Sequence, residues 1–137
     1  MNQRYMLDTN VVSHIMQGRD AELLARLTNL PVGQLVMSSV TLAELEYGLR
    51  RKGQPTRLKN ALTQVLLRMD VLPWDEKVAT CYGELCTSLE AQGINLSDFD
   101  MMIAAHALAV SAILVTRDRA FAQVPPNQHP QWTLEIW

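Results

Sequence analysis

The feature that most constrains this chain is a short apolar segment that ends in a carboxylate and leads directly into a helical pattern. Residues 5–7 (Tyr-Met-Leu) are too few for a helix, and Asp8 follows them at once. Apolar side chains then recur between residues 11 and 16 at the spacing of one helix face. Ligands of open parallel sheets gather beyond the carboxyl ends of the strands. We therefore expect Asp8 to lie at the edge of a sheet where chemistry takes place.

The same alternation of short strands and longer helices continues along the chain. Further strands are expected at 35–37, 71–72, 112–116 and 132–137, and helices are expected to begin near residues 11, 20, 38, 56, 75 and 98. Strands that alternate with helices favour right-handed crossovers and a parallel sheet covered on both faces. The sequence predicts an α/β fold, a three-layer α/β/α sandwich with a central, mainly parallel sheet of four to five strands. At 137 residues, it is expected to form one domain over residues 1–137.

Composition excludes several classes of protein. Apolar residues make up 48% of the chain, but no run approaches the ~20 apolar residues that span a bilayer, and no secretion signal is visible. Cys81 and Cys86 lie on different faces of one predicted helix, which disfavours a disulfide between them. The three histidines are scattered, so a zinc site has little support. We expect a soluble cytoplasmic protein.

Four acids occupy positions that such a sheet would bring together. They are Asp8, Glu44, Asp100 and Asp118. Two of them follow predicted strands, and the other two begin or line adjoining helices. Each has an ordinary explanation by itself, as a helix cap, a turn residue or an exposed helical carboxylate. Their joint placement is harder to dismiss, because a doubly wound sheet would collect all four at one edge.

Glu44 is distinguished from its neighbour Glu46 by its surroundings in the helix. Glu46 lies four residues before Arg50, the spacing of a helical ion pair. The positions three and four residues beyond Glu44 are Tyr47 and Gly48, which offer no such partner. Two residues turn the side chain by about 200° around a helix, so the two glutamates cannot share a face. Glu44 is therefore the one that a functional role would explain.

Converging carboxylates repel one another strongly unless a cation lies among them. With oxygen ligands and no convergent Cys or His, Mg²⁺ is the natural choice, and Mn²⁺ is expected to substitute. The net charge of −2 disfavours nucleic acid as a partner only if the four converging carboxylates are included in the sum. Setting four of the 14 acidic residues aside leaves ten, against 12 basic residues, a small positive excess outside the site.

Four segments resemble the PIN-domain ribonucleases and, more closely, the VapC toxins of bacterial toxin–antitoxin pairs. They are MLDTN at 6–10, SSVTLAELEYG at 38–48, DMMIAAHA at 100–107 and VTRD at 115–118. They lie in the family's order and together run nearly the full chain. The resemblance implies a PIN-like fold, metal-dependent cleavage of structured RNA and neutralisation by an antitoxin.

The resemblance also assigns roles to residues of this chain. It implies that Asp8, Glu44, Asp100 and Asp118 are catalytic, and that Asp8, Asp100 and Asp118 bind the metal. Asn10 and Thr116 match supporting positions. Where relatives usually have Gly-Pro-Tyr before the third acid, this chain has Ser-Asp-Phe at 97–99, which places Asp98 near the site as a further supporting residue. We expect His106 to form a structural hydrogen bond or face a partner, because it lies about 240° around its helix from Asp100.

The resemblance further implies a substrate and partners. Transfer RNA is expected as the substrate, with initiator transfer RNA favoured, and inhibition of translation as the outcome. A VapB-type antitoxin would cover the groove of the toxin, and both a homodimer and a hetero-oligomer with the antitoxin are expected. Five basic residues are candidates for contacts with RNA phosphates, namely Arg50, Arg51, Lys52, Arg117 and Arg119.

Two other functions remain open from the residues themselves. An aspartate at the end of a first strand is also typical of phosphotransferases that form an aspartyl-phosphate, which here would form on Asp8. Those enzymes usually carry a second aspartate two residues later, where this chain has Asn10. Alternatively, the chain is a non-catalytic PIN-like module that binds a partner, and its acids are only caps.

Overall fold

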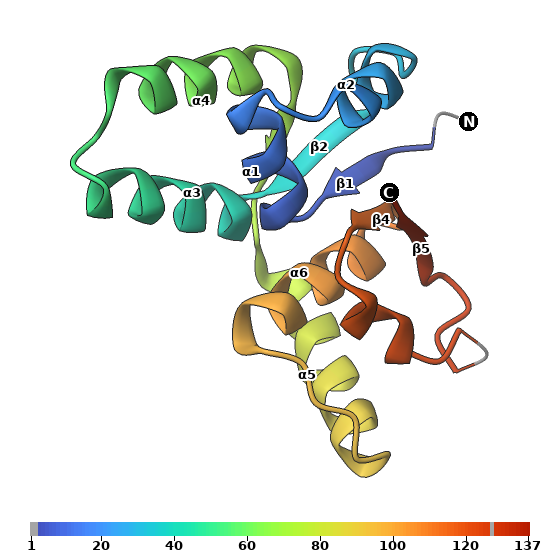
Figure 1. Cartoon of the computed structure of the whole chain (residues 1–137). Helices are drawn as coiled ribbons and strands as arrows, with labels where there is room; N and C mark the ends of the chain where they lie inside the picture. Colours follow the sequence, from blue (N-terminus) through green and yellow to red (C-terminus); the bar gives the residue numbers. More distant parts are fainter. Residues whose placement is uncertain (1–2, 127) are drawn as a thin grey trace.

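The computed structural model describes residues 3–126 and 128–137 and is built around a five-stranded sheet in which every neighbouring pair is parallel (Figure 1). The strands are β1 (Tyr5–Leu7), β2 (Leu35–Ser38), β3 (Asp70–Leu72), β4 (Ile113–Thr116) and β5 (Thr133–Ile136). Their order in space is β3-β2-β1-β4-β5. The short segment that precedes Asp8 is thus the central strand, and the predicted last strand is an edge.

Each helix begins at a residue whose preferences are local. The helices are α1 (Thr9–Gln17), α2 (Ala21–Thr28), α3 (Ser39–Arg51), α4 (Thr56–Arg68), α5 (Glu76–Ala91) and α6 (Asp98–Ala109), with a 3₁₀ helix η1 (Arg119–Gln123) after β4. At the start of most of these helices, a side-chain oxygen accepts a backbone N–H. The residues that supply this oxygen are Asp8, Asp20, Ser38, Asp75, Ser97 and Asp118. Such caps satisfy N–H groups that have no partner within the helix. The predicted helix starts are confirmed to within about two residues.

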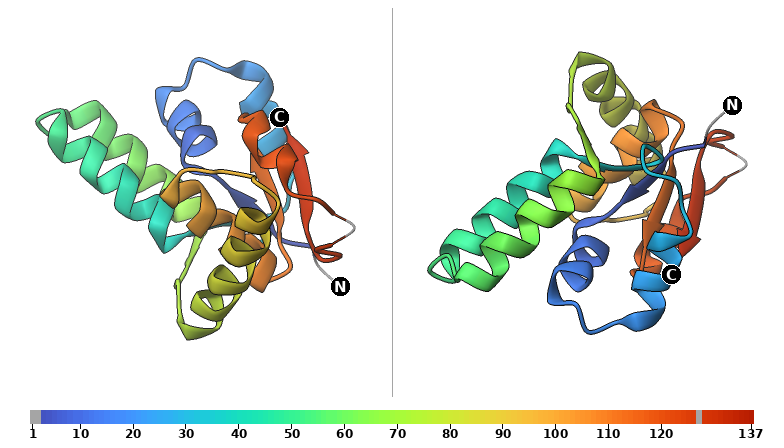
Figure 2. Two further views of the ribbon diagram at one scale, coloured as in Figure 1. Left: turned by 90° about the horizontal axis from the view of Figure 1, so that it is seen from below. Right: turned by 90° about the horizontal axis from the view of Figure 1, so that it is seen from above.

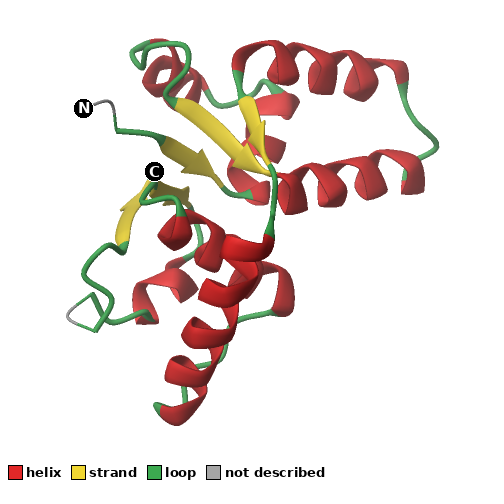
Figure 3. Ribbon diagram, turned by 180° about the vertical axis from the view of Figure 1, so that it is seen from behind, coloured by secondary structure: helices red, strands yellow, loops and turns green. Residues whose placement is uncertain are grey.

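Helices cover both faces of the sheet, so the predicted three-layer sandwich is confirmed (Figure 3). Met6 and Val36 point to the face covered by α5 and α6. Their neighbours Leu7, Leu35 and Met37 point to the face covered by α1, α2 and the α3–α4 pair. Successive side chains of a strand point to opposite faces, and burial on both faces explains why these strands are apolar throughout.

The α3 and α4 helices form a hairpin that extends away from the sheet (Figure 2). Leu45 and Leu49 on α3 belong to the same buried cluster as Leu62 and Val65 on α4. The turn between the helices includes Gly53 at φ +80°, a left-handed conformation that glycine adopts without steric cost. Gly53 therefore lets the chain reverse between α3 and α4.

Within residues 3–126 and 128–137, no helix combines the length and apolar character that crossing a bilayer requires. Cys81 and Cys86 are free thiols. The longest helix, α5, packs along α6 and carries its own buried stripe, which includes Leu85 and Leu89. These two helices form one outer layer, and the first turn of α6 carries Asp100.

Candidate active site

Asp8 lies at the carboxyl end of the central strand, and both of its carboxylate oxygens are engaged. Oδ1 accepts the backbone N–H of Val11 at 2.9 Å, which makes Asp8 the cap of α1. Oδ2 accepts the hydroxyl of Thr116 at 2.5 Å. The side chain is buried, with 2% of the residue exposed. Asp8 therefore does cap α1, as its ordinary explanation requires. The cap uses only one of its two oxygens, and capping does not account for the burial of the carboxylate.

Thr116 connects Asp8 to Asp118 across neighbouring strands. Its Oγ1 donates to Asp8 and also accepts the backbone N–H of Asp118 at 2.9 Å. Asp118 itself accepts the N–H of Ala120 at 2.9 Å and caps η1. One buried hydroxyl thus fixes the loop after β4 relative to the end of β1, because it pairs with groups on both.

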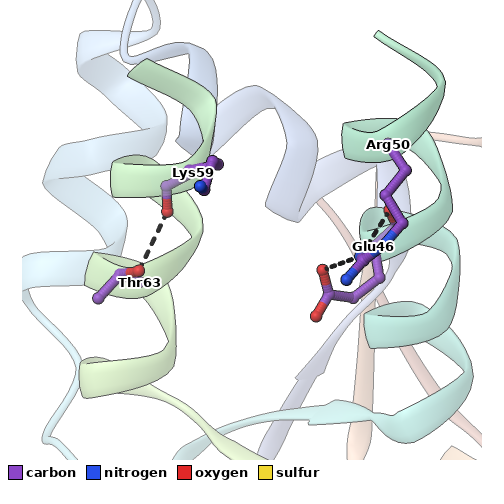
Figure 4. A network of polar contacts seen from close by, with 4 residues as sticks. All are labelled: Glu46, Arg50, Lys59 and Thr63. Atoms are coloured by element: carbon purple, nitrogen blue, oxygen red, sulfur yellow. Dashed lines mark hydrogen bonds and ion pairs between the residues drawn. The ribbon is translucent and has the colours of Figure 1, made fainter. Parts of the chain in front are cut away.

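Glu44 is tied to the start of α1 by a residue that the sequence did not single out. Thr9 Oγ1 donates to Glu44 Oε1 at 2.5 Å and lies 3.4 Å from the hydroxyl of Thr41. Glu44 is half-buried, whereas Glu46 pairs with Arg50 at 2.8 Å on the outer side of α3 (Figure 4). The predicted difference between the two glutamates is confirmed.

Asp100 lies in the first turn of α6, where the Ser97 hydroxyl accepts its backbone N–H at 3.3 Å. Asp100 is half-buried, whereas Asp98 and Phe99 in the same turn are exposed. The α6 helix is buried on most sides after Met101, as its small and apolar sequence predicts. Its first turn therefore lies where a buried helix reaches the surface beside the ends of the strands.

The four carboxylates are close enough to act on one another. Burial raises the pKa of Asp8, against hydrogen bonds from Thr116 and Val11, and the charges of Asp100 and Asp118 raise it further. Burial also raises the pKa of Glu44, and the charge of Asp100 adds to this against the Thr9 hydrogen bond. The pKa of Asp100 is raised by burial and by Asp118. The fold therefore gathers the acids that the sequence placed at one edge of the sheet.

The donor set at this edge suits a hydrated divalent cation. All four side chains offer carboxylate oxygens, the ligands that Mg²⁺ prefers, and their mutual repulsion is the kind that a cation relieves. Among the residues that the structure describes, no three acid, histidine or cysteine side chains are drawn together tightly enough to enclose an ion by themselves. Mg²⁺ usually keeps several of its waters, so the residues fit an ion bound partly through water.

The supporting and basic residues predicted from the sequence lie in different surroundings. Asn10 is exposed, and its backbone carbonyl accepts a hydrogen bond from His14. Arg50 is ion-paired with Glu46, and Arg51 lies over the ring of Tyr47. The remaining three are Lys52, which is exposed, Arg117, which pairs with the α2 cap Asp20, and Arg119, which is exposed. Arg117 thus joins two loops, and its charge already has a partner.

His106 forms the structural hydrogen bond that its position suggests. Its Nδ1 lies 2.7 Å from the hydroxyl of Ser38, the residue that caps α3, and the side chain is fully buried. Burial lowers the pKa of His106 to about 4, with Asp75 opposing this change and Arg4 adding to it. A neutral imidazole therefore joins α6 to the start of the helix that carries Glu44.

Sequence reasoning missed Thr9 and Thr41, the hydroxyls beside Glu44. Thr9 follows the first acid directly, and Thr41 lies three residues before Glu44, on the same side of α3. Thr41 is fully buried although it is polar. The spacing to Glu44 was a usable signal for Thr41, whereas the contact between Thr9 and α3 depends on how α1 and α3 pack.

The raised carboxylate pKa values predict how stability depends on pH in metal-free protein. An acid whose pKa is raised in the folded state destabilises that state when ionised, and the penalty disappears as pH falls through the raised value toward the ordinary value near 4. Replacing Asp8 with Asn keeps an oxygen for the cap and removes the charge. In urea unfolding with a chelator present, we expect Asp8→Asn to be more stable than the unchanged protein at about pH 8 and this difference to shrink toward pH 5.

Comparing the two proteins at each pH cancels the opposite contribution of His106. Its pKa is about 4 when folded, so protonation of the unfolded chain below about pH 6.5 lowers the stability of both proteins equally. A stability difference that does not change with pH would show that burial does not perturb Asp8.

Comparison with known proteins places the site in a family. A model described as "PIN domain" matches residues 5–126. A protein of Haemophilus influenzae, "Ribonuclease VapC2", is 35% identical over 130 residues, with 94% of this chain and 98% of the relative covered. A protein of Shigella flexneri, "tRNA(fMet)-specific endonuclease VapC", is 35% identical over 131 residues, with 95% and 98% covered.

A solved structure agrees with these relatives along almost the whole chain. It is the complex of VapBC2 from Rickettsia felis with a DNA fragment from its promoter. It superposes with a TM-score of 0.86 at 29% identity, and the match covers 98% of this chain and 99% of the other. The strands and helices that carry the four acids all lie within this match.

Proposed function

This chain belongs to the PIN-domain family and, within it, to the VapC ribonucleases, and from that premise we propose that it is a Mg²⁺-dependent endoribonuclease toxin acting on transfer RNA. One observation carries the proposal. Buried Asp8 lies at the carboxyl edge of the sheet, close enough to Asp100 and Asp118 for their charges to add to the effect of burial and raise its pKa. Helix capping alone does not require these carboxylates to lie close together.

The residues divide the work of cleaving a phosphodiester bond. We propose that Asp8, Asp100 and Asp118 hold the ion, directly or through water, with Mn²⁺ able to replace Mg²⁺. The chemistry that an ion held by these residues would supply is activation of a water and neutralisation of charge on the phosphoryl oxygens. Thr9 holds one oxygen of Glu44, and the other oxygen is free to orient the attacking water or accept its proton.

Initiator transfer RNA is the substrate we propose, with inhibition of translation as the result. The Shigella flexneri relative is named as an endonuclease specific for tRNA(fMet), and it is similar to nearly the full chain. Cleavage in a loop suits half-buried acids at the edge of a sheet, because unpaired bases can be moved aside to bring the RNA backbone to the acids. Such a substrate would place the protein in the cytoplasm.

A VapB-type antitoxin is the partner we propose. An apolar groove of about 280 Å³ lies between α1, α2 and α4, on the side of the sheet that these helices cover. Its lining includes Ile15, Leu24, Leu27 and Val65, with Arg68 at its border. An antitoxin tail with apolar side chains would fill such a groove. Exposed Leu67 and Phe99 offer further apolar surface for a homodimer.

Sequencing RNA ends after a brief pulse of expression tests the proposal. We expect new ends at one position of initiator transfer RNA within minutes, while other abundant RNAs stay intact. The same ends should appear when purified protein and Mg²⁺ are added to total RNA. Co-expression with the antitoxin should suppress them. No new ends in either experiment, with folded protein present, would contradict the proposed activity.

A further inference from the structure

A cavity of about 300 Å³, lined by both polar and apolar side chains, opens beside Glu44, between α1 and the α3–α4 hairpin. At one end it is lined by Thr9 and Glu44, the hydrogen-bonded pair that belongs to the acid cluster. Farther from the acids, its lining includes Arg19, Lys52 and Arg57. The cavity therefore runs from the negative catalytic edge toward a group of positive charges.

The three cations come from different parts of the chain. Arg19 lies in the loop after α1, Lys52 is the C-terminal cap of α3, and Arg57 lies in the first turn of α4. All three side chains are exposed, and among residues 3–126 and 128–137 none of them forms an ion pair. By contrast, the charges of Arg50 and Arg117 are matched by acids. Three unmatched cations around one cavity form a site for an anion.

The start of α4 adds to this positive potential. Pro55 precedes the helix, and no side chain in the described part of the chain caps it. The first N–H groups of a helix lack partners within it and carry a partial positive charge, so an uncapped start that borders a cavity favours an anion there. Arg57 and Leu58, in this first turn, line the cavity. The backbone and the three side chains therefore favour the same kind of ligand.

We propose that this cavity, the cation pocket of Arg19, Lys52 and Arg57, binds a backbone phosphate of the RNA strand next to the phosphate that is cut. This inference rests on the proposed function, because it takes the acid cluster as the place of cleavage. A strand whose scissile phosphate lies at the acids must continue in one direction past Glu44. A positive pocket that begins at Glu44 therefore meets the next part of the RNA strand. A protein tail is not covalently joined to the scissile phosphate, so nothing comparable would direct it into this pocket.

The proposal changes which basic residues meet RNA. The sequence favoured the run 50–52, Arg117 and Arg119, but the ion pairs of Arg50 and Arg117 use their charges within the protein. Of these five residues Lys52 lines the cavity, together with Arg19 and Arg57, which are distant from it in sequence or separated from it by the hairpin turn. Arg19, Lys52 and Arg57 come together because α1 packs against α4, which the sequence alone does not indicate.

Salt-dependent RNA binding tests the pocket. The protein would carry Asp8→Asn so that RNA is not cut, and the probe would be a synthetic RNA hairpin spanning the cleavage site that the wild-type protein produces. Adding Arg19→Gln, Lys52→Gln and Arg57→Gln together should weaken binding by about tenfold or more. The slope of log Kd against log salt should flatten by about one unit, the effect of losing a phosphate contact.

The matched control is Lys59→Gln, on the same helix as Arg57. Lys59 is exposed, does not line the cavity, and contributes its carbonyl to a hydrogen bond from Thr63 (Figure 4). We expect this variant to keep the affinity and salt slope of the Asp8→Asn parent. In protein that retains Asp8, the triple change should raise KM and leave kcat within about twofold, because the acids are intact.

Two results would overturn the pocket and leave the proposed function standing. One is a triple variant whose RNA affinity and salt slope equal those of Lys59→Gln. The other is a triple variant that still binds the hairpin but no longer binds the antitoxin tail, which would assign the pocket to a protein partner. A wild-type protein that cleaves no RNA would instead contradict the proposed function itself.

Discussion

Asp8→Asn is expected to reduce RNA cleavage by about a thousandfold or more and to leave the fold intact. Asparagine keeps an oxygen that can accept the Val11 N–H, so the cap of α1 remains. Its amide can donate to the Thr116 hydroxyl oxygen in place of accepting from it. What disappears is the buried negative charge that a divalent ion requires, and losses of this size follow removal of a principal electrostatic group in an active site.

The control for this prediction is Asp75→Asn. Asp75 caps α5 through the N–H of Val78, as Asp8 caps α1, but it lies outside the acid cluster. The same chemical change at a comparable cap should leave cleavage within about twofold. Initial rates on the mapped RNA substrate measure both variants, with circular dichroism to confirm folding. Full cleavage by a folded Asp8→Asn variant would refute the catalytic role of Asp8.

Removal of divalent metal is expected to lower cleavage at least about a hundredfold. Within residues 3–126 and 128–137, no ion pair joins any of the four carboxylates to a basic side chain, so their charge is left for an added cation. Dialysis against EDTA followed by return of Mg²⁺ or Mn²⁺ should restore the rate in full. Thermal unfolding gives a second readout, since an ion that binds only the folded protein raises the unfolding midpoint as its concentration rises.

The second readout separates metal binding from activity. Mg²⁺ should raise the midpoint of the unchanged protein and raise that of Asp8→Asn much less. Undiminished cleavage in EDTA would contradict the metal requirement but would not exclude another ribonuclease mechanism. A phosphoryl group trapped on Asp8 would instead support the phosphotransferase alternative. No detectable cleavage by the folded, unchanged protein in the presence of Mg²⁺, with antitoxin binding retained, would support the partner-binding module.

Much of the fold was predictable because its signals are local. Asp8, Ser38 and Asp75 each stand directly before a helical pattern, and each accepts a backbone N–H as a cap. The paired apolar faces of the strands follow from burial on both sides of the sheet. The order of the strands, β3-β2-β1-β4-β5, was not predicted, because right-handed crossovers limit the possible arrangements without choosing among them.

The links between elements could not be read from local patterns. Thr9 reaches Glu44 across 35 positions, His106 reaches Ser38 across 68, and Arg117 reaches Asp20 across 97. Each contact joins two helices or loops whose approach depends on packing against the whole sheet. The acids could be proposed one by one from their places at element ends, but the hydroxyls and the cations around them depend on contacts distant in sequence.

The Thr116 hydroxyl restricts which residues its position can accept. The hydroxyl donates a hydrogen bond to Asp8 and accepts one from the backbone N–H of Asp118, so one oxygen atom takes part in both bonds. Valine has nearly the same shape and would fill the same space, yet it would leave both groups buried without a partner. Serine lacks a methyl group but keeps the oxygen. At this position a residue that keeps the hydroxyl, such as serine, should therefore be tolerated better than one that keeps the volume, such as valine. At most fully buried strand positions the opposite preference holds.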